Sequence, residues 1–340
     1  MAEAGGVVCF GELMLRLSAP DREVLLQTPR LDARFGGAEA NTAVSLARFG
    51  QRARMVTVLP DNPIGRAARD DLRRHGVDVG GLRFTGGRMG LYFLTPGAVL
   101  RPSEVIYDRA GSAFAEAAPD LIDWDRELEG AAWLHLSGVT PAVGARASEA
   151  AVRAARAARR LGVKVSFDGN YRAKLWAVWD GDGPAVSRSL LECADLAFID
   201  DRDVALVLNK TFDGLSRDER RRAAADTAFA AFPHLARIAS TVRVQSVVDD
   251  QQISASLFTR ENERRAQVYS LSGVVDRIGG GDAFAAGVLH GLLRGLDDQA
   301  SLDFALASAA LKHSVPGDFN LIGEADVQAL LSGGGLDVRR

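Results

Sequence analysis

Near the end of the chain the sequence reads Asp276-Arg277-Ile278-Gly279-Gly280-Gly281-Asp282-Ala283-Phe284. Three consecutive glycines allow the backbone to approach a ligand closely and to direct several N–H groups at one point. The residues that follow predict a helix over residues 282–294, which places the glycines at a helix N-terminus, where the dipole attracts anions. This segment therefore predicts an anion-binding turn at the start of a helix.

Asp282, in the first turn of that helix, can be interpreted in two ways. As a capping residue it would accept hydrogen bonds from the free N–H groups of the turn. A cap, however, does not require three glycines before it. A carboxylate beside an anion site can instead take the proton of a substrate hydroxyl while the site holds the phosphoryl group under attack. We therefore predict that Asp282 is a general base and that Gly279, Gly280 and Gly281 form an anion hole.

Outside this segment, short apolar runs rich in β-branched residues alternate with alanine-rich helical patterns. This alternation is typical of an α/β fold with a mostly parallel central sheet flanked by helices. Besides residues 282–294, helices are expected to follow Gly37, to run from Pro63 towards His75, and to cover residues 143–161. The expected strands cover residues 7–10, 53–59, 133–137, 163–167, 195–199, 238–248 and 254–258.

Two segments interrupt the alternation. Residues 13–35 and 90–109 contain strand-like stretches with prolines and no helix. They could pair into a small sheet that acts as a lid over an active site, since lids exclude water and complete a site on closure. An ordinary surface hairpin or a contact between two copies of the chain explains them equally well. We expect one domain over residues 1–332, with these lid segments inserted, and a disordered glycine-rich tail over residues 333–340.

Composition excludes several classes of partner. The net charge of −3 gives no basic field for nucleic acid, and the arginines of residues 217–222 alternate with acidic residues, as on a solvated helix face. No apolar stretch approaches the ~20 residues that span a bilayer, and no secretory signal pattern is visible, so we expect a cytoplasmic protein. Cys9 and Cys193 are expected to be buried thiols.

Several nucleotide-binding motifs are absent. The chain has no GxxxxGK[ST] run and no His-Arg-Asp or Asp-Phe-Gly set, which excludes a P-loop phosphotransferase and a protein kinase. It also lacks GxGxxG after the first strand, which excludes a Rossmann-type dehydrogenase. A kinase with this sequence must have another architecture.

Residues 276–284 resemble the C-terminal signature of the ribokinase-like (PfkB) carbohydrate kinases. Gly36-Gly37-Ala38-Glu39-Ala40-Asn41-Thr42-Ala43 resembles their N-terminal signature, and the similarity covers residues 7 to about 330. The resemblance implies a ribokinase-like fold with a small β-sheet lid, ATP and Mg²⁺ as cofactors, and transfer of the γ-phosphoryl group to a primary alcohol. It implies sugar contacts from Gly36, Gly37 and Asn41. It further implies a homo-oligomer, and it leaves dependence on a monovalent cation open.

Four more segments, residues 90–93, 107–114, 168–172 and 312–320, resemble the 2-keto-3-deoxygluconate kinases of this family. Such a substrate carries a carboxylate, for which an arginine fork is the usual partner. The reaction would give 2-keto-3-deoxy-6-phosphogluconate, and the sequence does not separate the gluconate from its galactonate epimer. A neutral ketose such as fructose is the alternative substrate. A non-catalytic sugar-binding regulator is the alternative class, which the intact Asp282 and glycine turn disfavour.

The predicted sugar-acid contacts come from these segments. Arg109 and Arg172 are expected to bind the carboxylate, with Tyr92 and Tyr107 as hydroxyl donors; an arginine stacked on surface tyrosines is the structural alternative. Asp168 follows a strand at the edge where α/β sheets bind ligands. We expect Asn170 to contact the sugar too, although an asparagine there could simply shape a turn.

The sequence departs from the family pattern at several positions. Arg16 stands where ribokinase-type members carry an aspartate, which disfavours ribose-like substrates and favours an acid. Residues 200–203, Asp-Asp-Arg-Asp, are the nearest match to the family's metal-side motif, and no metal ligand is assigned. Arg277 stands where a threonine is frequent in the signature, and the sequence offers no physical explanation for the arginine.

On the nucleotide side, Thr241 and Arg243 are expected phosphate contacts. His313 is expected near the nucleotide. The other four histidines have no partner at metal-ligand spacing, so we expect structural roles for them and no zinc site.

Overall fold

The computed structural model describes residues 5–333 and is built around a ten-stranded sheet. The predicted tail therefore lies outside the described residues, apart from Gly333. The strands of this sheet are β1 (Val7–Phe10), β4 (Ala53–Pro60), β5 (Asp78–Thr85), β8 (Trp133–Ser137), β9 (Lys164–Asp168), β10 (Leu196–Phe198), β11 (Arg237–Val247), β12 (Asp250–Phe258), β13 (Glu263–Arg265) and β14 (Tyr269–Ser272).

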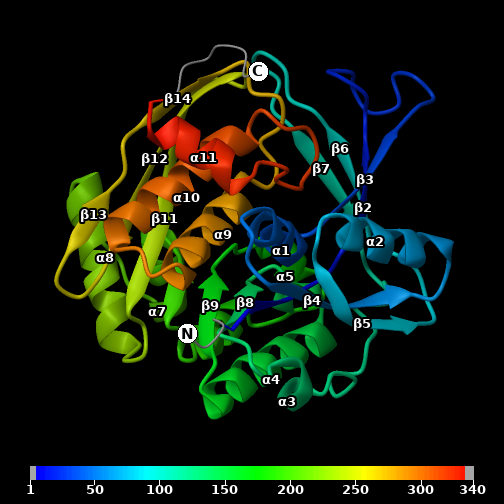
Figure 1. The fold of residues 1–340 in the computed structure, drawn as a ribbon, viewed down its shortest axis with the longest axis horizontal. Helices are drawn as coiled ribbons and strands as arrows, with labels where there is room; N and C mark the ends of the chain where they lie inside the picture. The colour runs from blue at the N-terminus through cyan, green and yellow to red at the C-terminus, as the bar shows by residue number, and fades with distance from the viewer. Residues whose placement is uncertain (1–4, 334–340) are drawn as a thin grey trace.

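The order of the strands is β13-β12-β11-β10-β9-β8-β1-β4-β5, and β14 pairs with β12 beside this path (Figure 1). From β11 to β5, neighbouring strands are parallel. Only the pairings of β12 with β11, β13 and β14 are antiparallel. The expected mostly parallel sheet is thereby confirmed. The carboxyl ends of its parallel strands form one edge, where ligands bind in such sheets.

Helices cover both faces of the sheet, and each face has its own hydrophobic core. One core includes residues of α1 (Ala38–Arg48), α2 (Pro63–Arg74), α9 (Gly280–Leu293), α10 (Asp298–Lys312) and α11 (Glu324–Leu331). The other includes residues of α3 (Trp124–Glu127), α4 (Ala145–Leu161), α6 (Gly183–Leu191), α7 (Asp201–Leu208) and α8 (Arg217–Ala231). The short α5 (Ala173–Ala177) lies beside a 3-10 turn, Pro141–Val143.

The helix boundaries follow local sequence. α2 begins at Pro63, where the side chain of Asn62 accepts hydrogen bonds from the N–H groups of Ile64 and Gly65, both at 3.0 Å. α4 begins two residues later than expected, because residues 141–143 form the 3-10 turn. α9 begins at Gly280, so two of the three glycines belong to its first turn.

The two interrupting segments form a separate four-stranded sheet, which we call the lid sheet. It contains β2 (Met14–Ser18), β3 (Asp32–Gly36), β6 (Leu91–Thr95) and β7 (Glu104–Asp108), in the order β3-β2-β6-β7. The outer pairs are antiparallel, whereas β2 and β6 are parallel, with Leu15 opposite Leu91. In Figure 1 these strands stand beside the main sheet. The expectation of one small sheet outside the main sheet is confirmed.

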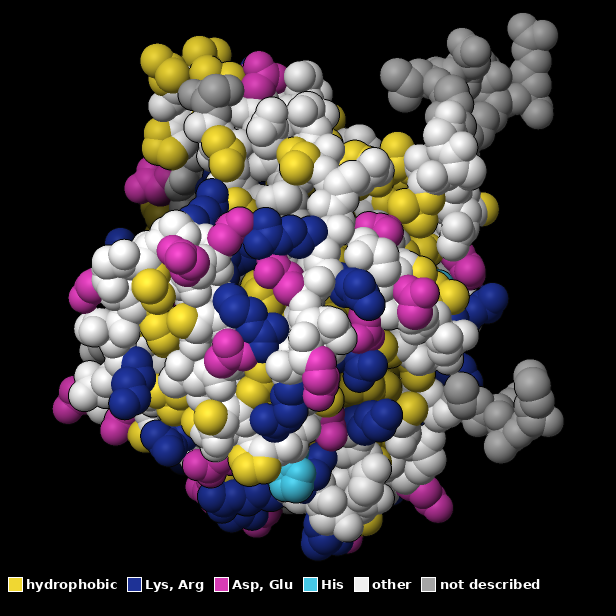
Figure 2. All heavy atoms as spheres, turned by 90° about the vertical axis from the view of Figure 1, so that its left-hand side faces the viewer, with side chains coloured by type: hydrophobic (Ala, Val, Ile, Leu, Met, Phe, Trp, Pro, Cys, Tyr) yellow, Lys and Arg dark blue, Asp and Glu magenta, His cyan; other side chains and the backbone are white. Residues whose placement is uncertain are grey.

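Charged side chains of both signs alternate on the face that carries α7, α8 and β13 (Figure 2). On α8, Arg220 pairs with Asp201 at 2.6 Å, and Asp218 pairs with Arg265 at 2.7 Å. Arg217 and Asp218 are exposed as predicted, whereas Arg221 packs over the ring of Phe258 and donates to Ser240 and Ser256, so the stretch is only in part a solvated helix face. Within residues 5–333, no helix has the length and apolarity that crossing a membrane requires.

Close packing between α9 and α10 supports the helix that carries the glycine turn. We expect Gly287→Ala to destabilise the protein, because a Cβ at Gly287 would lie 2.5 Å from the Cα of Ala305. Overpacking costs about 1–3 kcal/mol, more than the ~1 kcal/mol that alanine gains in helix propensity. Urea unfolding followed by circular dichroism measures the change. Gly86→Ala is the control, since a Cβ there meets nothing within 4 Å; equal losses in the two variants would contradict the packing argument.

Candidate active site

A polar cavity of about 300 Å³ lies between the lid sheet and the carboxyl-terminal edge of the main sheet. It is lined by most of the residues predicted to bind the sugar, namely Gly37, Asn41, Tyr92, Tyr107, Arg109, Asp168, Asn170 and Arg172. Gly279, Gly281 and Asp282 line the same cavity, as do Arg243 and Arg277. The structure therefore brings the predicted base, anion hole and sugar-acid contacts to one place.

The glycine turn owes its shape to its tight surroundings. Gly279 has φ +84°, and a Cβ there would lie 2.0 Å from the carbonyl oxygen of Asp318. Behind the turn, a Cβ on Gly280 would lie 3.0 Å from the ring of His313. Within residues 5–333, the N–H groups of Gly281 and Asp282 have no backbone acceptor. These donors are available to an anion at the start of α9.

Asp282 is held by the N-terminal signature. The Nδ2 of Asn41 donates to Oδ2 of Asp282 at 2.7 Å, while Oδ1 of Asn41 accepts from the N–H of Gly37 at 3.2 Å. Burial raises the pKa of Asp282 to about 7, against the lowering effect of the Asn41 hydrogen bond. A carboxyl group with a pKa near neutrality is suited to accept a proton. Asn41 thus positions Asp282, a role that the sequence did not reveal.

A second group of carboxylates lies at the ends of β9 and β10. Burial, and then the charges of Asp282 and Asp203, raise the pKa of Asp168 to about 8. Burial and the Asp200 carboxylate raise the pKa of Asp203 to about 6. An adjoining cavity of about 220 Å³ is bordered by Asp168, Asp200 and Asp203, and by Thr241 and Gly281. Because Thr241 is a predicted phosphate contact, this cavity corresponds to the predicted nucleotide side of the site.

These carboxylates fit a magnesium ion that arrives with a nucleotide. Within residues 5–333, no group of three or more His, Cys, Asp or Glu side chains is arranged to hold a metal. Mg²⁺ is commonly held through one or two carboxylates plus substrate phosphates, so such a group is not required. The pKa values of Asp168 and Asp203 are raised first by burial and then by neighbouring carboxylates, and a bound cation would oppose both effects. Both residues fit Mg²⁺, which the sequence had left unassigned.

Arg109 is buried, with 5 % of its side chain exposed, and it is paired with Glu12. Its Nε and Nη2 donate to Oε2 of Glu12 at 2.7 and 2.6 Å, and Oε1 of Glu12 accepts from Ser112 at 2.6 Å. The Nη1 of Arg109 is buried without a partner. Arg109 is therefore a fixed arginine with one free donor, rather than a mobile lid side chain.

Arg172 and Asn170 follow β9. Arg172 is exposed, and its recorded hydrogen bond is to the carbonyl oxygen of Tyr171 at 3.2 Å, so its guanidinium retains donors for a ligand. Its charge lowers the pKa of both Asp168 and Asp282. Asn170 has φ +33°, which shows that it shapes a turn, and it also lines the cavity. The two interpretations of Asn170 are compatible.

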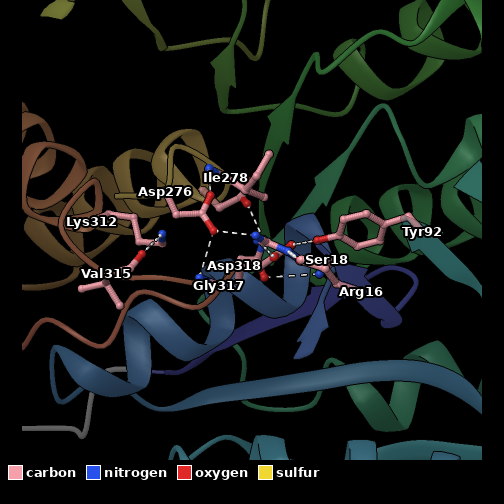
Figure 3. Close-up of polar contacts among 12 residues, drawn as sticks. Arg16, Ser18, Tyr92, Asp276, Ile278, Lys312, Val315, Gly317 and Asp318 are labelled. Atoms are coloured by element: carbon pink, nitrogen blue, oxygen red, sulfur yellow. Dashed lines mark hydrogen bonds and ion pairs between the residues drawn. The ribbon is translucent and has the colours of Figure 1, made fainter. Parts of the chain in front are cut away.

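Arg16 does not face a free carboxylate site, which corrects the argument that it favours an acid substrate. Its Nη2 donates to Asp276 at 2.7 Å and its Nη1 to Asp318 at 2.8 Å, while Nε donates to Ser18 at 2.6 Å (Figure 3). Only 5 % of its side chain is exposed. Its donors are used within the protein, so Arg16 ties the lid sheet to the segments before and behind the glycine turn.

The two tyrosines differ in position. The hydroxyl of Tyr92, which is buried, donates to Oδ2 of Asp318, so its proton is not free for a sugar. Tyr107 is 41 % exposed, and its ring lies 5.6 Å from the guanidinium of Arg109. The stacked arrangement of arginine and tyrosine therefore does occur, inside the cavity.

The nucleotide-side predictions have mixed outcomes. Arg243 is exposed and lines the main cavity, and Thr241 borders the adjoining one. His313 is buried, its Nδ1 lies 2.6 Å from the carbonyl oxygen of Ala309, and burial lowers its pKa to about 4. His313 lies behind Gly280, on the protein side of the turn, and its contact with the nucleotide stays a prediction.

Several buried carboxylates of the site escaped prediction. They are Glu12, Glu39, Asp276 and Asp318. Glu39 accepts three hydrogen bonds at one oxygen, from the N–H and hydroxyl of Ser137 and from Thr140, at 2.7–2.9 Å. A Cβ at Gly11 would lie 2.0 Å from its other oxygen. Glu39 lies in the N-terminal signature and Asp276 in the C-terminal one, so their place in these motifs could have indicated that they belong to the site.

Comparison with known proteins agrees with this geometry. The model of the pfkB family carbohydrate kinases matches residues 5–322. The 2-dehydro-3-deoxygalactonokinase of Haloferax volcanii is 33% identical, over 98% of this chain and 99% of that protein. The 2-dehydro-3-deoxygluconokinase of Bacillus subtilis is 26% identical, over 92% and 91%. The crystal structure of 2-dehydro-3-deoxygluconokinase from Thermotoga maritima has a TM-score of 0.91 and 38% identity, covering 97% of this chain and 100% of that one.

The raised pKa of Asp168 predicts a pH-dependent gain in stability for Asp168→Asn. Folded Asp168 keeps its proton up to about pH 8, whereas in the unfolded chain an aspartate loses its proton near pH 4. As the pH rises between these two values, the wild-type protein therefore loses up to ~1.4 kcal/mol of unfolding free energy per pH unit. The variant lacks this loss, so its melting temperature should exceed that of the wild type by more at pH 8 than at pH 5. Differential scanning calorimetry measures this. Asp213→Asn, at an exposed position, is the control; a gain independent of pH would contradict the charge argument.

Proposed function

The chain belongs to the pfkB family of carbohydrate kinases, and from that membership we propose that it phosphorylates 2-keto-3-deoxygluconate at its primary hydroxyl with ATP. One observation carries the choice of an acid. Arg109 presents a buried donor without a partner, and Arg172 retains free donors, in the same cavity as Asp282. A carboxylate oxygen would give this donor a charge-assisted hydrogen bond, which is stronger than the bond that a neutral sugar oxygen would make.

In this proposal the substrate carboxylate binds between Arg109 and Arg172. Glu12 fixes the guanidinium of Arg109 through two hydrogen bonds, so the free Nη1 has a defined direction. An arginine held in this way loses little side-chain entropy when it binds a ligand. Binding the acid end there orients the chain of the sugar, whose far end carries the hydroxyl to be phosphorylated.

Asp282 then removes the hydroxyl proton. Its Oδ2 accepts from Asn41, which leaves Oδ1 for the substrate. As the hydroxyl oxygen forms its bond to the γ-phosphorus, the bond from that phosphorus to the β-bridging oxygen breaks, and ADP leaves. In this proposal the N–H groups of Gly281 and Asp282, which have no backbone acceptor within residues 5–333, stabilise the negative charge of the transferred group.

Asp168, Asp203 and Thr241 border the nucleotide side of the site. When bound with ATP, Mg²⁺ would neutralise phosphate charge, and the two aspartates are its proposed protein partners. We assign no residues to a monovalent cation, and the association of copies through the lid sheet stays a prediction.

The galactonate epimer, 2-keto-3-deoxygalactonate, is the second candidate substrate. The name of the Haloferax volcanii relative, 33% identical over 98% of this chain, favours it. The name of the Thermotoga maritima protein, 38% identical, favours the gluconate. Both substrates present the same carboxylate to the two arginines, so the proposal for the acid end is common to them.

Asp282→Asn tests the base. We expect turnover to fall by ~10²–10⁴ with ATP binding retained, because asparagine cannot accept the proton. In the wild type, kcat/KM should fall as the pH drops below about 7, where Asp282 becomes protonated, and the neighbouring Asp168 will couple to this transition. Initial rates of ADP release between pH 5.5 and 9 measure both. Normal turnover in the variant would overturn the assignment.

The second test concerns the acid. ADP release is compared for 2-keto-3-deoxygluconate, its galactonate epimer, fructose and ribose. We expect the keto acids to be preferred, and Arg172→Gln to lower kcat/KM for them by about 10- to 100-fold, the worth of a charged hydrogen bond of ~1.5–3 kcal/mol. For fructose the change should be under about threefold. Arg188→Gln, on the exposed side of α6, is the control. A preference for fructose would exclude the acid-binding role, and no ADP release with any sugar would favour the non-catalytic alternative.

A further inference from the structure

Besides Arg172, two arginines of the active-site cavity have no counterion within residues 5–333. Arg243 comes from β11, and Arg277 precedes the glycine turn. Both line the cavity that also contains Gly279, Gly281 and Asp282. Within residues 5–333, neither guanidinium makes a hydrogen bond or an ion pair with a protein group. Arg16, Arg109 and Arg220, by contrast, all have carboxylate partners.

The two charges lie close to each other. Arg243 is exposed to the cavity, yet the partial burial of its guanidinium there lowers its pKa, and the nearby charge of Arg277 lowers it further. Two like charges that face one cavity without a counterion repel each other, and the repulsion is relieved only when an anion binds between them. The pair therefore predicts a strongly negative ligand group at this end of the cavity.

The position of the pair identifies which anion this is. The substrate carboxylate has its own partners, Arg109 and Arg172, one of which comes from the end of β7 and the other from the end of β9. Arg277 instead lies two residues before Gly279 in the turn whose free N–H groups predict an anion. The group expected in front of that turn is the phosphoryl group in transfer.

We propose that Arg277 and Arg243 clamp the transferred phosphoryl group that binds in front of the glycine turn. The clamp rests on the proposed kinase activity and adds to its mechanism. It does not depend on whether the sugar is either epimer or a neutral ketose. Guanidinium groups match the spacing of phosphate oxygens and bind them through two parallel hydrogen bonds. In the step already described, the proton goes to Asp282, the γ-phosphorus changes its oxygen partner, and the clamp moves no proton.

This role gives Arg277 the physical account that its sequence position lacks. Charge on the equatorial oxygens of the phosphoryl group is held by arginines in other phosphotransferases, where one such residue accelerates transfer by ~10³–10⁵. Arg277 also borders a further cavity with Arg34 and Asp276. Arg277 is half-buried and borders both cavities, so its guanidinium can reach a ligand in the active site.

The test compares nucleotides that differ only in the terminal phosphate. Isothermal titration of the full chain with Mg²⁺ and either AMP-PNP or ADP gives two dissociation constants, whose ratio reports contacts to the γ-phosphate. The variants are Arg277→Gln, Arg243→Gln and the double variant. Arg277→Lys keeps a charge without the fork, and Arg217→Gln, on exposed α8, is the control.

We expect each single glutamine variant to reduce the preference for AMP-PNP over ADP by about tenfold, with ADP affinity changed less than threefold. Arg277→Lys should recover part of the preference, and turnover of the glutamine variants should fall by at least 100-fold. An unchanged ratio, or an equal loss of affinity for both nucleotides, would overturn the clamp. Because no sugar is present, a failure of the proposed substrate leaves the ratio unaffected, and the two failures are distinguishable.

Discussion

The buried guanidinium of Arg16 is the interaction on which the active site depends. It joins β2 of the lid sheet to Asp276, just before the glycine turn, and to Asp318, just behind it (Figure 3). Asp276 in turn accepts from the N–H groups of Ile278 and Gly317, both at 3.0 Å. Removing one partner of such a buried pair is expensive, because it leaves charge without solvent or counterion. The shape of the turn and the position of the lid sheet are therefore set together.

Around this rigid centre, the site contains charges that the protein's own groups do not compensate. Asp168, Asp203 and Asp282 hold protons more tightly than usual, first because they are buried and then because other carboxylates lie near each of them. Arg243 and Arg277 repel each other at the same time. A magnesium–nucleotide complex would supply a cation to the first group and an anion to the second. Binding of such a complex would relieve the repulsion within each group of like charges. Unfavourable electrostatics of this kind is common at functional sites.

The sequence was sufficient to predict the features that depend on local pattern. The glycine turn, the strands β1 and β8 and the helix start at Pro63 all follow from residues that are neighbours in the chain. The role of Arg16 could not be predicted in this way, because its partner Asp318 lies 302 positions away. Its charge suggested a ligand, whereas the fold supplies two internal carboxylates. The position of the His313 ring behind Gly280 could not be predicted either, because the sequence does not show which side of the turn the ring occupies.

The parallel pairing of β2 with β6 has a consequence for how the chain acquires activity. Leu15 lies opposite Leu91, and between them the chain must first complete α1, β4, α2 and β5 of the main sheet. Contacts between such distant segments form late, because a long loop must close before any contact compensates for it. The anchors Asp276 and Asp318 are synthesised long after β2 and β6. A nascent chain that has not yet reached them therefore has neither a lid sheet joined to the main domain through Arg16 nor a complete glycine turn.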